Sequence, residues 1–369
     1  MRAYVVEKET LQSNIRAILQ RAGDVPVWAV LKGNGYGLGI VPFAKMLREQ
    51  GVTRFCVTEL REAKALRQAG FTEEAILMLQ PTVEREVLEQ LLDLHVICTV
   101  SSRDDAVVLN GIANEKDMVA EAHIKIDVGM GRYGFLPKEM DKILSIYEYM
   151  DGIAVSGIYT HFPMAFCSEK KTREQFEQFT YVLDQIAGRG FETGTPHCCN
   201  SAAFFRWKDM HLGGVRIGSA WLGRINVRGH NLRRVGYCVA RVQEIHWVKR
   251  GGTTGYGGVW RAKKPTRLAA VPVGWYHGFG VEYGRDSFRF RDCVRGSLSL
   301  LKAFLQRKKR RPHGLGLAGP DQCPGPCGYA PLYGGCDRCG LSCRRSGADR
   351  YQPPGAEGYG RGIPLNHTP

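Results

Sequence analysis

The chain has 369 residues, of which 44% are hydrophobic and 24% charged, a composition that is typical of globular proteins and argues against a disordered or collagen-like chain. No stretch approaches the roughly 18 uncharged apolar residues that a transmembrane helix needs. The net charge is +15, but the densest basic run, residues 307–311, contains no aromatic residue that could stack on bases, so we expect no nucleic-acid partner. Charged residues within the first ten positions, where a signal peptide has its apolar core, predict a cytoplasmic protein.

Short apolar runs alternate with helical patterns through the first part of the chain. Runs of about four to eight residues followed by longer amphipathic helices are typical of parallel strands covered by helices. Roughly eight such units predict a (β/α)8 barrel of the TIM type over residues 1–230, in preference to an open sheet. The expected strands are residues 27–31, 55–58, 75–79, 96–100, 123–127, 153–161 and 214–222, and the expected helices include residues 41–50, 59–68, 82–92 and 104–112.

The remaining chain changes character twice. Residues 239–248 and 267–273 are β-rich runs separated by a glycine-rich turn, which predicts a mainly β C-terminal domain over residues 231–313. Residues 314–369 contain 13 Gly and 8 Pro but no Val, Phe, Met, Trp or Lys. Such a segment buries little apolar area, so we expect it to be disordered or out of frame and the β domain to be incomplete.

A lysine follows the first barrel strand, in the segment Ala29-Val-Leu-Lys-Gly-Asn-Gly-Tyr36. The carboxyl ends of the strands form the face where barrel enzymes have their active sites. Desolvation at such a position lowers the pKa of a lysine and allows its amine to form a Schiff base. Lys32 is therefore a candidate for covalent catalysis, with a solvated lysine in a glycine-rich loop as the alternative.

Cationic side chains also accompany two later strand ends. Lys125 lies in the run 123–127, and Arg132 lies in the glycine-rich turn after it, where an arginine can bind a carboxylate through two hydrogen bonds. His161 ends the run 153–161. For each alone, a surface arginine or a structural histidine is the simpler interpretation.

The last strand ends of the expected barrel carry small polar residues. Ser201 follows residues 197–200, and Gly218 and Ser219 follow the run that contains Arg216. A hydroxyl and neighbouring backbone amides of this kind form a plausible cradle for an anion such as phosphate.

Four motifs occur in order along the chain: VLKGNGYG at residues 30–37, GMGRYGF at 129–135, YTHF at 159–162 and NSAA at 200–203. Together they resemble the alanine racemase family, pyridoxal-phosphate enzymes with an N-terminal barrel and a C-terminal β domain. The resemblance runs from about residue 4 to about residue 311.

The resemblance implies a role for each matching residue. Lys32 binds pyridoxal 5'-phosphate covalently and moves the Cα proton of the amino acid on one face. The other implied contacts are Tyr36, Ser201, Gly218 and Ser219 with the phosphate, Arg216 with the pyridine nitrogen, His161 beneath the ring, Arg132 with the substrate carboxylate, and Lys125 as a carbamylation candidate that orients that arginine. Because arginine does not readily give up a proton, the pyridine nitrogen stays unprotonated and the ring becomes a weaker electron sink.

Racemisation also needs a second acid–base group on the opposite face. In the family a tyrosine of a Val-Gly-Tyr-x-x-Gly motif supplies it from the partner subunit, which implies a homodimer with shared active sites. Here residues 273–279 read VGWYHGF, so Trp275 stands at the tyrosine's position and Tyr276 one place later. A shift of one residue along a strand reverses the side-chain direction. We assign the second base to Tyr276, with His277 or impaired two-base chemistry as alternatives.

Five of the 12 cysteines lie between Cys323 and Cys343. The gap between Cys327 and Cys336 is shorter than the roughly 15–20 residues found in zinc ribbons, so we expect no metal site. When residues 333–363 are back-translated with free codon choice and shifted by one base, they permit a reading that alternates apolar and polar residues and resembles the family's closing strands. This favours a frameshift near residues 311–314.

The function predicted from the sequence is the interconversion of L- and D-alanine by a pyridoxal-phosphate enzyme. Racemisation of serine or another small amino acid is the alternative within the enzymes. A non-catalytic cofactor-binding protein or a truncated remnant is the alternative outside them. The expected partners are a small amino acid and a second copy of the chain, without nucleic acid or membrane.

Overall fold

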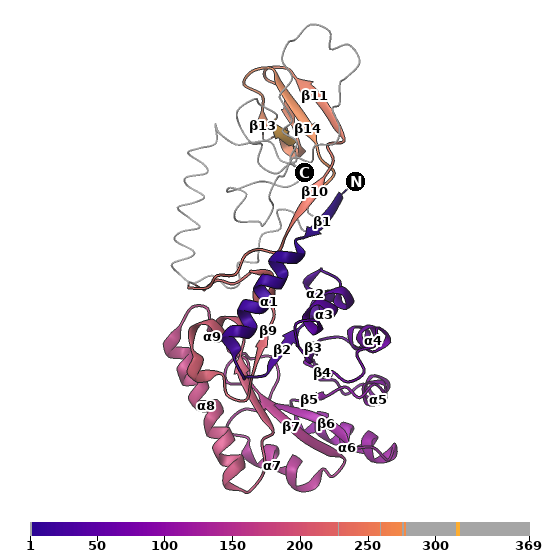
Figure 1. Cartoon of the computed structure of the whole chain (residues 1–369), viewed down its shortest axis with the longest axis vertical. Coiled ribbons are helices and arrows are strands. Elements are labelled where there is room, and N and C mark those ends of the chain that lie inside the picture. The colour runs from indigo at the N-terminus through magenta and orange to yellow at the C-terminus, as the bar shows by residue number, and fades with distance from the viewer. Residues whose placement is uncertain (1, 228, 259, 275–276, 278–314, 318–369) are drawn as a thin grey trace. The chain divides into compact units, whose positions relative to one another are not determined.

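The computed structural model describes residues 2–227, 229–258, 260–274, 277 and 315–317. The described residues divide into two compact units: the first is Glu7–Val235, and the second combines residues 2–6 with the described residues from Gly236 onward. Figure 1 shows the helices gathered in the first unit and short strands in the second.

Eight parallel strands form a nearly closed barrel in the first unit, which confirms the predicted fold. The strands are β2 Val27–Val30, β3 Arg54–Val57, β4 Ala75–Met78, β5 Cys98–Val100, β6 Ala120–Lys125, β7 Ile153–Tyr159, β8 Thr195–Cys199 and β9 Gly214–Ile217. They are ordered β4-β3-β2-β9-β8-β7-β6-β5, and a parallel bridge between Leu77 and Ile97 joins β4 to the segment that enters β5. β8 is not among the strands expected above, and the expected strand at 214–222 ends at Ile217 and continues as a 3-10 turn.

Helices connect the strands and cover the outside of the barrel (Figure 1). They are α1 Lys8–Ala22, α2 Lys32–Tyr36, α3 Ile40–Arg48, α4 Leu60–Gln68, α5 Arg85–Asp93, α6 Arg103–Glu115, α7 Met140–Tyr149, α8 Glu169–Gly188 and α9 Ser201–Arg206, with 3-10 turns η1 Lys208–Met210 and η2 Ser219–Leu222. Each longer helix buries one apolar face; in α1 this face is Leu11, Ile15 and Ile18, spaced as a 3.6-residue period requires. All four residues of β2 are buried, as expected for a strand covered on both faces.

The second unit is mainly β, as predicted. β1 Arg2–Val6 pairs antiparallel with β10 Gly236–Ala240, so residues 2–6 cluster with this unit although they precede the barrel in the chain. β11 Glu244–Val248, β14 Thr266–Ala270 and β15 Leu315–Leu317 form an antiparallel sheet, and β12 Thr253–Thr254 pairs with β13 Trp260–Arg261 around the 3-10 turn η3 Tyr256–Gly258. The expected strand at 239–248 is divided in two because β10 and β11 pair with different strands.

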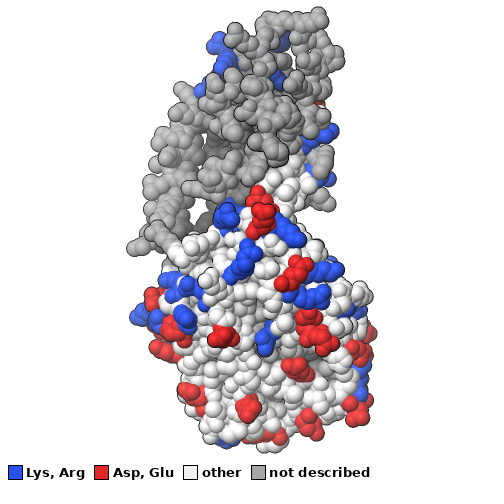
Figure 2. Space-filling model, in the orientation of Figure 1, with Lys and Arg blue, Asp and Glu red and all other residues white. Residues whose placement is uncertain are grey.

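Three residues of the expected tail therefore pair with β14. The rest of the tail, with its cysteines and most of the segment where a frameshift is expected, lies outside the described residues. None of the described helices is long and apolar enough to cross a membrane. On the visible face of the first unit, acidic and basic side chains are interspersed (Figure 2).

Candidate active site

The barrel brings most of the candidate residues to one end. They follow or end five strands: Lys32 and Tyr36 after β2, Lys125 and Arg132 at and after β6, His161 after β7, Ser201 after β8, and Arg216, Gly218 and Ser219 in and after β9. Because the strands are parallel, their carboxyl ends share one face of the barrel, the face used for catalysis in this fold. Residues up to 187 positions apart in the sequence, from Lys32 to Ser219, thus contribute to one region.

Lys32 begins a turn with left-handed backbone. Gly33, Asn34, Gly35 and Tyr36 have φ values of 66°, 53°, 64° and 55°. Two glycines adopt this conformation freely, but for Asn34 and Tyr36 it is unfavourable and must be held by the surroundings. The turn leaves the Lys32 side chain exposed, so the desolvation expected from the sequence is not found in this chain, and the amine is open to a ligand.

Tyr36, Ser201 and Gly218 converge on a small cradle. The Ser201 hydroxyl accepts a hydrogen bond of 3.1 Å from the Gly218 amide. A Cβ added to Gly218 would lie 2.1 Å from the Tyr36 hydroxyl oxygen, so only glycine allows this approach. Burial raises the pKa of Tyr36, which keeps its hydroxyl protonated as a hydrogen-bond donor.

A buried chain of polar groups supports this end of the barrel. Arg216, only 4% exposed, donates 2.8 Å hydrogen bonds to both Nδ1 and the carbonyl of His197, and also bonds the carbonyl of Thr160. His197 Nε2 lies 2.9 Å from His123 Nδ1. Among the described residues no carboxylate pairs with Arg216; its positive charge is held by neutral acceptors, and burial lowers its pKa.

Lys125 is the last residue of β6 and is 1% exposed. Its Nζ has no hydrogen-bond partner within the described residues and faces the rings of Tyr133 and Tyr159 at 5.4 and 5.1 Å. Burial, and next the charge of Arg216, lower the pKa of Lys125 to about 7. A large part of the Lys125 population is therefore a neutral amine near neutral pH.

Asp127 shapes the loop that carries Arg132. Its carboxylate accepts hydrogen bonds of 2.9, 2.7 and 2.9 Å from the amides of Gly129, Met130 and Gly131. The loop presents Arg132 as an exposed residue whose guanidinium carbon lies 4.6 Å from the centre of the Tyr133 ring. An exposed arginine on a loop fixed by three hydrogen bonds can receive a carboxylate.

The charges of four basic side chains act on His161. Its pKa is lowered well below the usual value, first by burial and then by the charges of Arg216, Lys125, Arg132 and Lys32. The ring is therefore neutral, and the surrounding region favours anions. Within the described residues, His, Cys, Asp and Glu form no group of three or more that could hold a metal ion.

The candidates for the second base belong to the segment 273–279, which follows the barrel in the chain. Trp275 and Tyr276 are outside the described residues. His277 is exposed, and its Nδ1 accepts a 3.1 Å hydrogen bond from the Gly274 amide. This bond leaves the proton of the neutral ring on Nε2.

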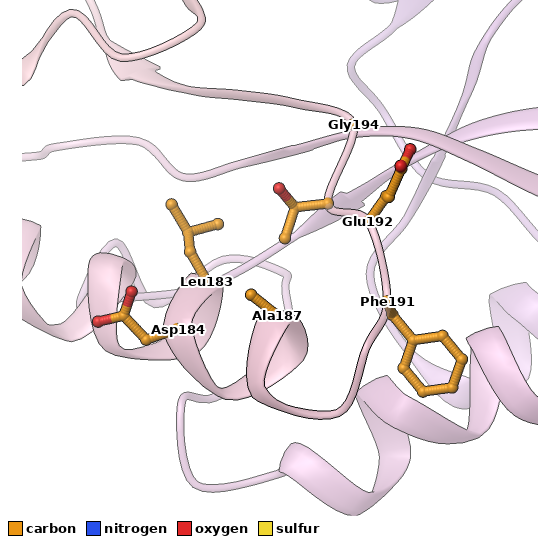
Figure 3. A pocket seen from close by; sticks show the side chains of 7 residues that line it. Leu183, Asp184, Ala187, Phe191, Glu192 and Gly194 are labelled. Carbon is orange, nitrogen blue, oxygen red and sulfur yellow. The ribbon is translucent and has the colours of Figure 1, made fainter.

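A separate hollow of about 430 Å³ lies between the C-terminal part of α8 and the segment that follows it (Figure 3). The last turn of α8 and residues 191–194, which lead into β8, line it. Because β8 runs away from this hollow towards Ser201, the hollow is at the amino-terminal end of the barrel and does not belong to the lysine site.

Several polar residues of this region have no role in the sequence analysis: Glu62, His123, Asp127, Tyr159 and His197. All are buried; Asp127 bonds amides of its own loop, and each of the others bonds a group of another element or loop. For His123 and His197, a histidine within a strand is the sequence signal that could have found them, because buried polar groups need partners.

The fold and the site define a (β/α)8-barrel enzyme with a lysine and an anion-binding region at the carboxyl end of its strands. Comparison with known families agrees. The family profile "Alanine racemase, N-terminal domain" matches residues 6–225, and "Alanine racemase, C-terminal domain" matches residues 235–294.

Individual relatives point to the same family. An alanine racemase of Desulforamulus reducens is 32% identical over 283 residues, which cover 74% of this chain and 76% of the relative. One of Methanococcus maripaludis is also 32% identical over 283 residues, 74% of this chain and 75% of the relative. The crystal structure of alanine racemase from Bacillus anthracis with bound L-Ala-P is 29% identical, with a TM-score of 0.70 over 75% of this chain and 74% of that one. The chain belongs to the alanine racemase family.

Proposed function

We propose that this protein is a pyridoxal-phosphate-dependent racemase that interconverts the L and D forms of a small amino acid, with alanine as the substrate of choice. The observation that carries the proposal is the placement of Lys32, Arg132 and Arg216 at the same end of the barrel as the neutral ring of His161, next to the hydroxyl and amide cradle at Gly218. A phosphorylated cofactor and an amino-acid carboxylate are both anions, and such a region attracts both.

The residues present fit the cofactor. The Tyr36 hydroxyl lies against Gly218 at a distance that only glycine allows, and the Ser201 hydroxyl lies 3.1 Å from the Gly218 amide, so two hydroxyls and a backbone amide, groups of the kind that bind phosphate, are close together. The residues that would hold the group are Lys32, Tyr36, His161, Ser201, Arg216, Gly218 and Ser219. When bound, pyridoxal phosphate withdraws electrons from the Cα of the attached amino acid and so makes its proton acidic.

The chain's own groups then hold the substrate and move the proton. Lys32 takes the Cα proton, or returns it, on one face. Arg132, on the loop fixed by Asp127, binds the carboxylate of the amino acid. Arg216 only donates hydrogen bonds, so it offers no proton acceptor or carboxylate that would stabilise a protonated pyridine nitrogen. With an unprotonated nitrogen the ring would withdraw fewer electrons from the Cα of the substrate, which favours prompt return of the proton to Cα.

Lys125 is proposed to become carbamylated. Its neutral Nζ attacks the carbon of CO2 and loses one proton to solvent, which leaves a carbamate of single negative charge. The lowered pKa and the lack of another hydrogen-bond partner among the described residues support this reaction. A carbamate there would face Arg132, one of the cations that act on Lys125, and orient its guanidinium.

The second acid–base group is proposed to be Tyr276 of a second copy of the chain, in a homodimer with shared sites. The support is the family membership and the VGWYHGF segment, in which Tyr276 lies one place beyond the family tyrosine. Trp275 at that position is the feature that favours the alternative, a protein that binds the cofactor without racemising.

Borohydride reduction tests the central claim. The full-length protein supplied with pyridoxal phosphate should show the visible absorption of a lysine-bound cofactor, and peptide mapping after reduction should find the label on Lys32. Lys32→Ala should abolish both, whereas Lys45→Ala, which removes an exposed lysine of α3, should leave them intact. A label elsewhere, or none, refutes the proposal.

A further inference from the structure

The carboxylate of Glu62 joins the lysine turn to the neighbouring strand. Glu62 lies in the first turn of α4 and is 4% exposed. Its Oε1 accepts a 3.0 Å hydrogen bond from the amide of Asn34, and its Oε2 accepts from the amide and hydroxyl of Thr58 at 2.9 and 3.3 Å. We propose that Glu62 is a positioning residue that fixes the left-handed turn of Lys32, an inference that rests on the proposed role of that lysine.

The pairing of Glu62 is unusual for a buried carboxylate. Within the part of the chain that the structure describes, Glu62 forms no ion pair, and its hydrogen bonds come from neutral donors. Burying an unpaired charge is costly, and a neutral side chain would avoid that cost. The negative charge strengthens the hydrogen bonds that Glu62 accepts from Asn34 and Thr58, because hydrogen bonds to an ionised acceptor are about twice as strong as neutral ones.

The hydrogen bond from Glu62 acts on the middle residue of the left-handed turn. Asn34 is a non-glycine residue with φ of 53° between two left-handed glycines. Its amide is held by Glu62, and its own side-chain Oδ1 accepts a 2.9 Å hydrogen bond from the Ile40 amide at the start of α3. Glu62 therefore ties the middle of the turn to the carboxyl end of β3, while Asn34 ties it to α3.

Two site residues flank that tie at equal distance along the chain. Lys32 lies two residues before Asn34 and Tyr36 two residues after it. If the Asn34 amide loses its acceptor, the turn can relax towards a right-handed conformation, because nothing else among the described residues bonds that amide. The Lys32 amine and the Tyr36 hydroxyl would then move relative to the cradle at Gly218.

The test is Glu62→Gln with Glu74→Gln as its matched control. Glutamine keeps the shape but replaces one acceptor oxygen with a donor NH2, so either Asn34 or Thr58 loses its acceptor whichever way the amide points. Glu74 is also a buried glutamate, at the amino-terminal end of β4, where it pairs with Arg48 at 3.4 Å. Both variants remove a buried charge, but only Glu62→Gln affects the lysine turn.

Three measurements on the full-length protein loaded with pyridoxal phosphate separate positioning from stability. They are the rate of borohydride labelling at Lys32, the rate of cofactor dissociation and the melting temperature. Glu62→Gln should slow labelling and speed dissociation, each by about 10- to 100-fold, the effect expected from loss of a hydrogen bond to a charged group. Glu74→Gln should change only the melting temperature.

The outcomes distinguish this inference from the proposed function. If the wild-type protein takes no label at Lys32, the proposed function fails. If the wild type is labelled and both Glu62→Gln and Glu62→Ala, which removes both acceptor oxygens, differ from it only in melting temperature, Glu62 is not a positioning residue. Should Glu62→Gln not fold, Glu62→Asp keeps the charge but withdraws it from Asn34; wild-type rates in that variant would equally overturn the inference.

Discussion

Arg216 donates two hydrogen bonds of 2.8 Å to His197, one to the ring Nδ1 and one to the backbone carbonyl oxygen. Because a guanidinium only donates, Nδ1 of His197 must be the acceptor and its proton must be on Nε2. That proton is donated to Nδ1 of His123, 2.9 Å away. Burial and the charge of Arg216 lower the pKa of His123 to about 3 and that of His197 well below its usual value. Both rings are therefore neutral and each has one fixed tautomer.

Replacing His197 with Phe tests this chain. Phenylalanine keeps a ring that can stack on Trp28, now 5.7 Å away at 14°, but removes the ring nitrogen that accepts from Arg216 and leaves the backbone carbonyl as an acceptor. We expect a loss of about 1–3 kcal/mol in the free energy of unfolding, the cost of leaving a buried donor unsatisfied. Denaturant unfolding measures it. His246→Phe, at an exposed position of β11, is the control and should change stability little; an equal effect in both variants would contradict the assignment.

The barrel could be predicted from the sequence because each strand and helix is marked by a pattern within its own residues. Apolar runs and helical periods mark β2 to β7 and β9 to within a few residues, and the order of the motifs places Lys32, Lys125 and Arg216 at the ends of strands. β8 was missed because its sequence, TPHCC, has no β-branched residue beyond its first and contains a proline and a histidine.

The polar network could not be predicted in the same way. His123 and His197 are 74 residues apart, and only the closure of the barrel brings their rings together. The left-handed turn after Lys32 shows in the sequence as glycines, but its conformation depends on Glu62, 28 residues beyond Asn34. Contacts of this range follow from strand order and register, which a local pattern does not specify.

The buried amine of Lys125 should make stability depend on pH. Its pKa falls from 10.5 to about 7 on folding. Above pH ~7 the unfolded chain keeps a proton that the folded chain has lost, so stability rises with pH, by about 1.4 kcal/mol per pH unit, and below pH ~7 the folded state carries the full cost of the buried charge. Denaturant unfolding of the cofactor-free protein in CO2-free buffer from about pH 7 to 8.5, below the pKa of unfolded thiols, should show this slope. Lys125→Met should remove it, and an unchanged slope would contradict the assignment.

The same amine should add CO2. With 13C-labelled bicarbonate, the protein at about pH 8, above the lowered pKa of Lys125, should show a carbamate carbon signal that Lys125→Met abolishes. Lys142→Met, which removes an exposed lysine of α7, is the control. A signal that survives Lys125→Met would place the carbamate on another amine.

Gly218→Ala should weaken the cofactor site through contact with Tyr36. The added Cβ would lie 2.1 Å from the Tyr36 hydroxyl oxygen, so the tyrosine must move. We expect a strain of about 1–3 kcal/mol and weaker binding of pyridoxal phosphate, measured by titration of the visible absorption band. Adding Tyr36→Phe should recover part of the stability, because it removes the atom in closest contact. Gly111→Ala in α6, where a Cβ has open space, should be neutral or slightly stabilising; similar binding losses in both alanine variants would refute the cradle.

The coding nucleotides around residues 311–314 test the proposed frameshift. A one-base shift there should give a continuation of alternating apolar and polar residues in place of the glycine- and proline-rich tail. The C-terminal family profile matches only as far as residue 294, and about a quarter of the Desulforamulus reducens relative lies outside the matched region. If no one-base shift yields such strands, the tail as written is the genuine end of this reading frame, and the pairing of Leu315–Leu317 with β14 is part of its fold.

Racemisation depends on a second acid–base group, which moves a proton on the face of Cα opposite Lys32. A protein with only Lys32 can remove and return the Cα proton on one face, which exchanges hydrogen with solvent but never inverts the centre. Tyr276→Phe should therefore keep deuterium exchange at Cα for one enantiomer of alanine in D2O and lower inversion by about 10²- to 10⁴-fold, the usual contribution of a general acid–base group. If Tyr276 is the second base, His277→Gln should leave inversion unchanged. If instead His277→Gln abolishes inversion and Tyr276→Phe does not, the histidine is the second base. Exchange without inversion in the unmodified protein would show that Trp275 at the family's tyrosine position has cost the chain its racemase activity.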